Sequence, residues 1–246
     1  DISYQDGAAI SGESSQVFFT PSSFKISISE IPANRDFFYT DEAFAVTIQA
    51  LSHKNEITEN YRGEVILQLP DGVVIGEEGI SSSYEFTEND SGTKRFSNVS
   101  GTQEGEGVIV VTDSNYADIS SESAQLEFKK GWIVVEDNEG EVGDLNVKIK
   151  IVDNNNTIIS SDNTTIFSLT LKEEKSNGTA SFQSESKDVK ITNGLAVVIL
   201  NDTEEETVEV IPDSTPYLEP VKGSIKFFKS FIGNEGIRIR MWREIK

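Results

Sequence analysis

The chain contains no cysteine, a single histidine and a single methionine among its 246 residues. The absence of cysteine excludes disulfide bonds, thiolate nucleophiles and cysteine-based metal sites. The longest uninterrupted apolar run is Leu195–Leu200, far shorter than the roughly 20 residues that a membrane-spanning helix needs. The first residues, DISYQDGAAIS, are acidic and polar and contain no signal peptide. The chain is therefore either intracellular or a mature form whose signal has been removed.

Basic residues are scarce. Lys and Arg number 21 against 42 Asp and Glu, which gives a net charge of −21. Most of such a surface repels a polyanion, so nucleic acid is excluded as a partner.

Catalytic motifs are also missing. The sequence has no Gly-x-Ser-x-Gly turn, phosphate-binding glycine loop or histidine-rich metal motif. His53 lies in a polar loop, where it is interpreted as a solvated residue. Two converging carboxylates, as in glycosidases, stay an alternative without support from any motif. The prediction is a protein that is not an enzyme.

Alternating hydrophobicity is what the chain has instead. In the stretch 44–69, Phe44, Val46 and Ile48 alternate with polar or small residues, and Val65 and Leu67 repeat the rule. Successive side chains of a strand point to opposite faces, so this pattern predicts two half-buried strands joined by a polar loop. No segment of ten or more residues shows a convincing helical period. About seven short strands in roughly 105 residues are typical of an immunoglobulin-like sandwich.

The design is duplicated. VIVVTDS at 108–114 matches VEVIPDS at 208–214, AQLEF at 124–128 matches SIKFF at 224–228, and FAVTIQA at 44–50 matches LNVKIKI at 145–151. Three segments that keep one register predict tandem copies of one fold. We expect sandwiches at 24–128 and 131–228, joined with almost no linker and with limited hinge freedom, after an N-terminal arm at 1–23.

These strands resemble a known family. VKIKIVDNNNTI, TIFSLTL and GLAVVILNDTEEETVEVIPDS are similar to bacterial immunoglobulin-like domains of the invasin and intimin kind, and AFAVTIQA, YRGEVILQL and GVIVVTDS are similar to related modules of bacterial and archaeal surface proteins. Arg62 departs from the small residue that usually precedes Gly63. The resemblance covers roughly 24–228 and implies a structural or adhesive cell-surface protein without active-site residues.

The two ends differ chemically. Residues 1–20 carry three acidic and no basic side chains, whereas residues 224–246 carry six basic and two acidic ones, leaving −25 for the rest of the chain. A hairpin at 229–246, turning at Gly233–Gly236, either caps the second sandwich or pairs with a neighbouring subunit by strand addition. The predicted assembly residues are Ile237, Arg238, Ile239, Arg240, Met241 and Trp242 in the C-terminal strand, and Ile2, Tyr4, Ile10, Val17, Phe18 and Phe19 in the N-terminal arm.

Calcium is the one cofactor that the sequence suggests, because it takes six to eight oxygen ligands in irregular geometry. The candidate ligands are Asp137, Glu139, Glu141, Asp144, Asp153 and Asp162, expected on loops at strand ends. Solvated acidic turns are the alternative. If the ion binds, the cluster at 137–144 is expected to stiffen the junction between the modules.

Other surface features suggest glycans. Acceptor sequences for N-glycosylation begin at Asn89, Asn98, Asn155, Asn163, Asn177 and Asn201, although an unmodified polar surface explains them equally well. Tyr4, Tyr61, Tyr116, Tyr217 and Trp242 are candidate sugar-binding aromatics, but a tyrosine near a strand end is more often a corner residue of the sandwich.

Together these features predict an all-β, extracellular structural protein of the cell surface, a filament or layer subunit that binds copies of itself. The alternatives are a monomeric adhesin that binds a surface glycan or protein ligand, and an accessory module pair of a larger secreted protein.

Overall fold

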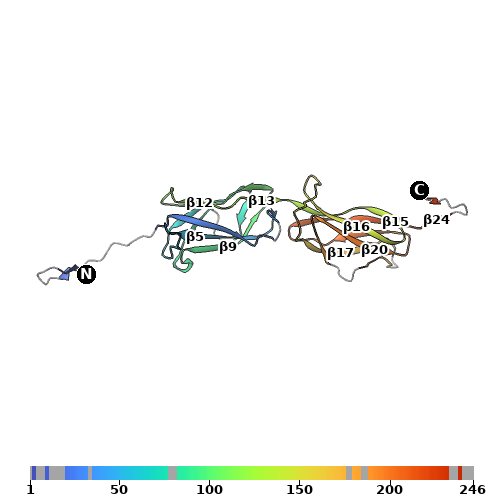
Figure 1. The fold of residues 1–246 in the computed structure, drawn as a ribbon, viewed down its shortest axis with the longest axis horizontal. Coiled ribbons are helices and arrows are strands. Elements are labelled where there is room, and N and C mark those ends of the chain that lie inside the picture. Colours follow the sequence, from blue (N-terminus) through green and yellow to red (C-terminus); the bar gives the residue numbers. More distant parts are fainter. Residues whose placement is uncertain are drawn as a thin grey trace.

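The computed structural model describes residues 2–3, 9–10, 20–32, 35–76, 82–175, 179–183, 188–232 and 238–239, and only the backbone at 2–3, 9–10, 231–232 and 238–239. These residues form two β-sandwiches placed end to end (Figure 1). The predicted all-β, immunoglobulin-like fold class is confirmed.

The first module contains three sheets. One has the order β3-β5-β9-β7, formed by Ser23–Ser29, Phe44–Leu51, Thr93–Gly101 and Val73–Ile75. The facing sheet has the order β12-β11-β6-β8, formed by Ser120–Glu122, Val110–Asp113, Glu64–Gln68 and Ser83–Glu85. A third has the order β10-β13-β4, formed by Gly105–Gly107, Leu126–Lys129 and Phe38–Tyr39. A single 3-10 turn, η1, spans Glu88–Asp90.

The second module has two five-stranded sheets. The order β18-β20-β16-β14-β22 contains Ser181–Phe182, Leu195–Asp202, Gly143–Val152, Gly131–Val135 and Leu218–Val221. The order β15-β23-β21-β17-β19 contains Asn138–Glu141, Gly223–Phe228, Thr207–Pro212, Ile166–Glu173 and Asp188–Lys190.

The predicted alternation determines which residues enter the cores. In β5, Phe44, Val46 and Ile48 are buried while Thr47 and Gln49 are half-buried. In β6, Val65 and Leu67 are buried between exposed neighbours. Each module thus has its own hydrophobic cluster. The cluster of the second module, however, includes Phe37 and Tyr39 of the first.

The terminal segments form separate two-stranded sheets. β1 (Ile2–Ser3) pairs with β2 (Ala9–Ile10), and β24 (Phe231–Ile232) pairs with β25 (Arg238–Ile239). The C-terminal hairpin therefore closes on itself. The side chains of the predicted assembly residues at both ends lie outside the described residues, so these predictions stay untested.

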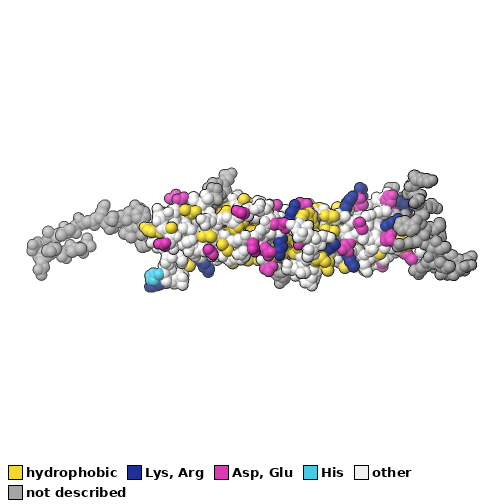
Figure 2. All heavy atoms as spheres, turned by 90° about the horizontal axis from the view of Figure 1, so that it is seen from above, with side chains coloured by type: hydrophobic (Ala, Val, Ile, Leu, Met, Phe, Trp, Pro, Cys, Tyr) yellow, Lys and Arg dark blue, Asp and Glu magenta, His cyan; other side chains and the backbone are white. Residues whose placement is uncertain are grey.

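The surface of the rod mixes acidic, basic and apolar side chains along its length (Figure 2). In the described part of the chain, no helix has the length and apolar character needed to cross a membrane.

Candidate functional site at the joint between the modules

Three consecutive aromatic residues divide themselves between the two cores. β4 runs parallel to β13, with Phe38 opposite Phe128 and Tyr39 opposite Lys129. Because side chains alternate along an extended segment, Phe38 points into the first module, where its ring stacks on that of Phe44 with centroids 4.4 Å apart. Phe37 and Tyr39 point the other way and are fully buried in the core of the second module.

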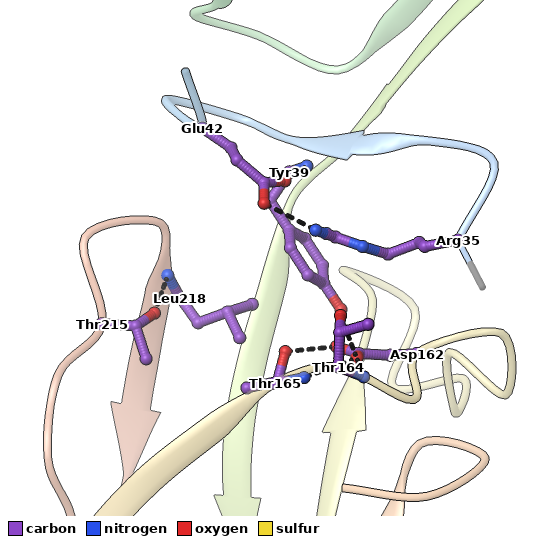
Figure 3. Close-up of polar contacts among 8 residues, drawn as sticks. All are labelled: Arg35, Tyr39, Glu42, Asp162, Thr164, Thr165, Thr215 and Leu218. Atoms are coloured by element: carbon purple, nitrogen blue, oxygen red, sulfur yellow. Dashed lines mark hydrogen bonds and ion pairs between the residues drawn. The ribbon is translucent and has the colours of Figure 1, made fainter. Parts of the chain in front are cut away.

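Tyr39 ends on a buried carboxylate of the second module, Asp162 (Figure 3). Its hydroxyl donates a hydrogen bond of 2.7 Å to Oδ2 of Asp162. The same oxygen accepts the hydroxyl of Thr165 at 2.6 Å, and Oδ1 accepts the backbone N–H groups of Thr164 and Thr165 at 3.0 and 3.1 Å. Asp162 is fully buried, and these donors replace the water that it gives up.

The pair is electrostatically polarised. Burial, and then the charge and hydrogen bond of Asp162, raise the pKa of Tyr39 far above its ordinary value. Burial alone would raise the pKa of Asp162, but hydrogen bonds from Thr165, Thr164 and Tyr39 hold this pKa below its usual range. A neutral phenol therefore donates to an ionised carboxylate, which is the strong form of such a bond.

Arg35 covers the joint from the side of the first module. Its guanidinium carbon lies 4.4 Å from the ring centre of Tyr39, and Nη2 donates to Oε1 of Glu42 at 2.6 Å. Oε2 of Glu42 accepts the backbone N–H of Tyr39 at 2.8 Å. Within the described residues, Nε and Nη1 of Arg35 have no hydrogen-bond partner, so the aromatic faces provide much of the stabilisation of this buried cation.

The second module completes the enclosure of Tyr39. The ring of Tyr217 stacks on it with centroids 5.6 Å apart and planes inclined by 10°. Gly131, the first residue of β14, leaves space for the same ring: a Cβ atom there would lie 2.7 Å from Tyr39 and 2.7 Å from Leu218. Only glycine lets the backbone of the second module approach so closely.

Polar contacts surround this apolar centre. Nδ2 of Asn154 donates to Oε2 of Glu104 at 2.7 Å, and Lys130 forms an ion pair of 3.1 Å with Glu219. A cavity of about 340 Å³ beside the joint is lined by residues of both modules, among them Glu106, Glu127 and Asp153. The joint is thus closed by two chain segments, the direct connection at Lys130 and the segment 35–42.

The first module has a matching pair of its own. The hydroxyl of Tyr61, which is 1% exposed, donates to Oδ2 of Asp113 at 2.7 Å. Burial, and then the bond to Asp113, raise the pKa of Tyr61. A Cβ atom at Gly63 would lie 2.5 Å from the Tyr61 hydroxyl, so this glycine too makes room for a tyrosine ring.

Backbone hydrogen bonds show that Tyr61 and Asp162 hold equivalent positions. Thr58 N–H donates to Ala50 O at 2.8 Å, as Ile159 N–H does to Ile151 O at 2.9 Å. Three residues later, Tyr61 N–H donates to Thr58 O at 3.0 Å, and Asp162 N–H donates to Ile159 O at 3.1 Å. Where the first module places a tyrosine, the second places an aspartate, and it receives its phenol from the first module.

The predicted calcium ligands do not gather at the joint. Asn138–Glu141 is a strand, β15, and not the expected loop; it pairs in parallel with β23. Because β14 carries the chain away from Gly131, the cluster at 137–144 lies at the far end of the second module and cannot stiffen the junction. The expectation of a junction cluster was wrong.

The individual carboxylates already accept local hydrogen bonds. Oδ1 of Asp137 accepts Ser224 N–H, Oδ1 of Asp153 accepts Asn155 and Thr157 N–H, and Asp144 accepts the side chains of Asn201 and Gln183. In the described ranges, no three acidic or histidine side chains converge in a way that could hold a metal ion. Calcium binding itself stays a prediction.

The predicted glycan acceptors differ in accessibility. Asn89, Asn98 and Asn155 are exposed, whereas Asn163 and Asn201 are half-buried. Nδ2 of Asn201 donates to Asp144 at 2.7 Å, and Oδ1 of Asn163 accepts Asn193 N–H at 2.7 Å. Asn177 lies outside the described residues. Glycosylation is untested by these contacts.

Of the candidate sugar-binding aromatics, Tyr61 is buried and Tyr217 is half-buried against Tyr39. The corner-residue alternative therefore describes Tyr61, and Tyr217 is part of the joint. Tyr116 is exposed, and so is His53, as expected.

Sequence comparison places the chain in a family. Residues 2–175, more than half of the chain, match the model of DUF6701, third domain. The chain belongs to the DUF6701 family. No curated protein matches this DUF6701 chain.

Several solved structures are similar to the DUF6701 chain. FdeC, described as an Escherichia coli adhesin, has a TM-score of 0.48 and 14% identity, covering 85% of this chain and 66% of FdeC. A C-terminal fragment of intimin, solved with its translocated receptor, has a TM-score of 0.36 and 16% identity, covering 80% and 62%. Domains 4 and 5 of the S-layer protein SbsC have a TM-score of 0.38 and 11% identity, covering 85% and 99%. The expected kinship with immunoglobulin-like adhesin domains is confirmed at the level of fold.

Proposed function

We propose that this chain is a non-enzymatic, extracellular structural protein whose two modules form one stiff unit of a surface filament or layer. The observation that carries the proposal is the burial of Phe37 and Tyr39 in the core of the second module. Bending at the joint would withdraw both rings from that core and leave Asp162 without the phenol.

The energetic scale supports stiffness. Removing a large aromatic side chain from a core costs about 3–5 kcal/mol, so a bent state that exposes Tyr39 is populated well below one per cent. Lys130 alone separates β13 from β14, which leaves almost no slack in the direct connection. A stiff rod that resists bending suits a spacer or a lattice subunit better than it suits a hinged binding cleft.

Pulsed electron paramagnetic resonance tests the stiffness. The chain has no cysteine, so cysteines introduced at the exposed residues Glu122 and Asn146 can be labelled selectively. We expect a narrow distance distribution that broadens in Tyr39→Ala. The matched variant Tyr61→Ala should leave the distribution narrow. A broad distribution in the unsubstituted chain would show that the modules swivel.

Association between copies is the second part of the proposal. The opposite charges of residues 1–20 and 224–246 favour head-to-tail contact, and a heterologous contact that does not close produces a filament. Strand addition between subunits is the proposed mode. Removing residues 1–20 or 233–246 should abolish assembly seen by electron microscopy, and unchanged assembly after both deletions would reject this mode.

A further inference from the structure

One outer surface of the second module combines aliphatic side chains with lysines. We call it the lysine–aliphatic face and define it by Val134, Lys148, Lys150, Leu195, Val197 and Ile199. The register of β14, β16 and β20 places Lys150 opposite both Val134 and Leu195, and Lys148 opposite Val197. Residues paired in this way share one face of the sheet.

The aliphatic side chains of this face are unusually accessible. Leu195, Val197 and Ile199 are 43%, 58% and 39% exposed, and Val221, which pairs with Val134, is 42% exposed. These are four of the eleven large hydrophobic residues that are exposed in the described part of the chain. Figure 2 shows apolar side chains beside basic ones on the second module. A contiguous apolar patch with charged neighbours is typical of an interaction site.

The fold does not require such a face. The equivalent positions of the first module, defined by the pairs Gln49 with Thr93 and Thr47 with Arg95, are all polar. Arg95 forms an ion pair of 2.5 Å with Glu30. The same sheet is therefore solvated in one module and apolar in the other, so the difference belongs to the second module and not to the architecture.

The charges on the face select its occupant. Lys148 is exposed, and Lys150 forms an ion pair of 3.2 Å with Glu136. A positively charged segment, such as the C-terminal residues, is repelled here, and so is a second lysine–aliphatic face. Residues 1–19 carry three carboxylates, no basic side chain and six large apolar residues, which is the complementary composition.

The position where this segment leaves the body favours contact between two copies. Ser22 N–H donates to Leu51 O at 2.7 Å, which fixes the start of the first module at the end away from the joint. To reach the face of its own chain, the acidic segment would have to run back along residues 24–128, which carry six basic and 19 acidic side chains. A second copy presents its face without that repulsion.

We propose that the lysine–aliphatic face of one copy binds the acidic, apolar N-terminal residues 1–19 of a second copy. This inference rests on the proposed association of copies through their terminal segments and assigns the surface that receives one of them.

Sedimentation velocity of the full chain over a range of concentrations tests the face. Val197→Lys should weaken association about tenfold or more, since it places a charge in the apolar centre of the contact. The matched control is Val74→Lys, because Val74 is 44% exposed on β7 of the first module. The control should associate as the unsubstituted chain does.

Deletion of residues 1–19 tests the occupant. Both cores remain intact in this variant, since neither contains a residue before Phe24. We expect the shortened chain to stay monomeric and to bind a fluorescein-labelled peptide of residues 1–19, measured by anisotropy, with Val197→Lys again weakening the binding about tenfold.

Each contrary result points to a different error. Association of the shortened chain would show that the face meets another body surface and would reject the occupant. A full chain that is monomeric while the shortened one binds the peptide would show docking within one chain. Equal effects of Val197→Lys and Val74→Lys would reject the face but keep terminal association, and neither association nor peptide binding would reject both.

Discussion

The two modules close the same end of the same sandwich with the same pair of groups, but from different sources. In the first, Tyr61 and Asp113 both belong to the module. In the second, Asp162 is its own, while Tyr39 comes from the neighbouring module. A buried phenol–carboxylate bond that stabilises one module in the first case therefore couples two modules in the second, which changes a corner into a joint.

The largest effect is expected from removing each tyrosine ring. Tyr39→Ala should destabilise the second module by about 3–5 kcal/mol, because a large side chain leaves its core, although the substituted residue lies in the first. Tyr61→Ala should destabilise the first module by a similar amount. Hydrogen exchange measured by mass spectrometry resolves the two modules. Loss of protection confined to the first module in both variants would refute the borrowed-tyrosine interpretation.

The glycines that face the two rings provide a gentler test. Gly131→Ala and Gly63→Ala each place a methyl group within 2.7 Å of a tyrosine, and overpacking of this kind costs about 1–3 kcal/mol. Thermal unfolding should show lower stability in both. Gly105→Ala is the control, because no atom lies within 4 Å of its added Cβ, and a loss as large in this control would point to glycine chemistry and not to the rings.

Alkali should act on both pairs. The pKa of Tyr39 and that of Tyr61 are raised in the folded chain, so their contribution to stability is fully present below about pH 10 and falls as the pH rises further. The expected loss is about 1.4 kcal/mol per pH unit for each group. Denaturant unfolding at several pH values measures it, and Tyr39→Phe should remove the share of the joint. A slope unchanged in that variant would contradict the assignment.

Acid should act on the joint through Asp162. Because the folded pKa of Asp162 is lowered, its contribution is present above the ordinary value near 3.9 and is lost as the pH falls below it. The unfolding free energy of the second module should therefore decline at low pH, and Asp162→Asn should decline less steeply. Equal declines would exclude Asp162 as the source.

The smallest effect is expected at the rim. Lys130 and Glu219 form an exposed ion pair across the direct connection, with side chains 45% and 63% exposed. Such pairs contribute about 0–1 kcal/mol, so Lys130→Ala should leave unfolding and the spin-label distances nearly unchanged. A change as large as that of Tyr39→Ala would move the centre of the joint to its rim.

The strands were predictable and the joint was not, for physical reasons. Alternation along 44–69 and 145–152 reports which face of a strand is buried, and that is the same in any context. Residues 35–42 show three adjacent aromatics, and the direction in which each points depends on β4 pairing with β13, a contact between residues about 90 positions apart. The match of 44–50 with 145–151 at an offset of 101 does place Tyr61 on Asp162. That replacement of an aromatic by an acid was the available signal.

The calcium interpretation failed at the junction for a related reason. Acidic residues after a strand look like a loop, but Asn138–Glu141 finds a partner in β23, which lies far away in sequence. Its counterpart in the first module is β4, which also pairs in parallel with the last strand of its module. At this position one module carries aromatics and the other carries glycine and carboxylates, so only the first can insert into a neighbour.

A double-mutant cycle between Tyr39→Phe and Asp162→Ala tests the central claim most directly. Unfolding of the second module is followed in the unsubstituted chain, both single variants and the double variant. If the phenol of one module stabilises the core of the other through this bond, the two substitutions should be non-additive, with a coupling of about 0.5–3 kcal/mol. Additive effects would contradict the claim and would leave the modules as two independent sandwiches that merely touch.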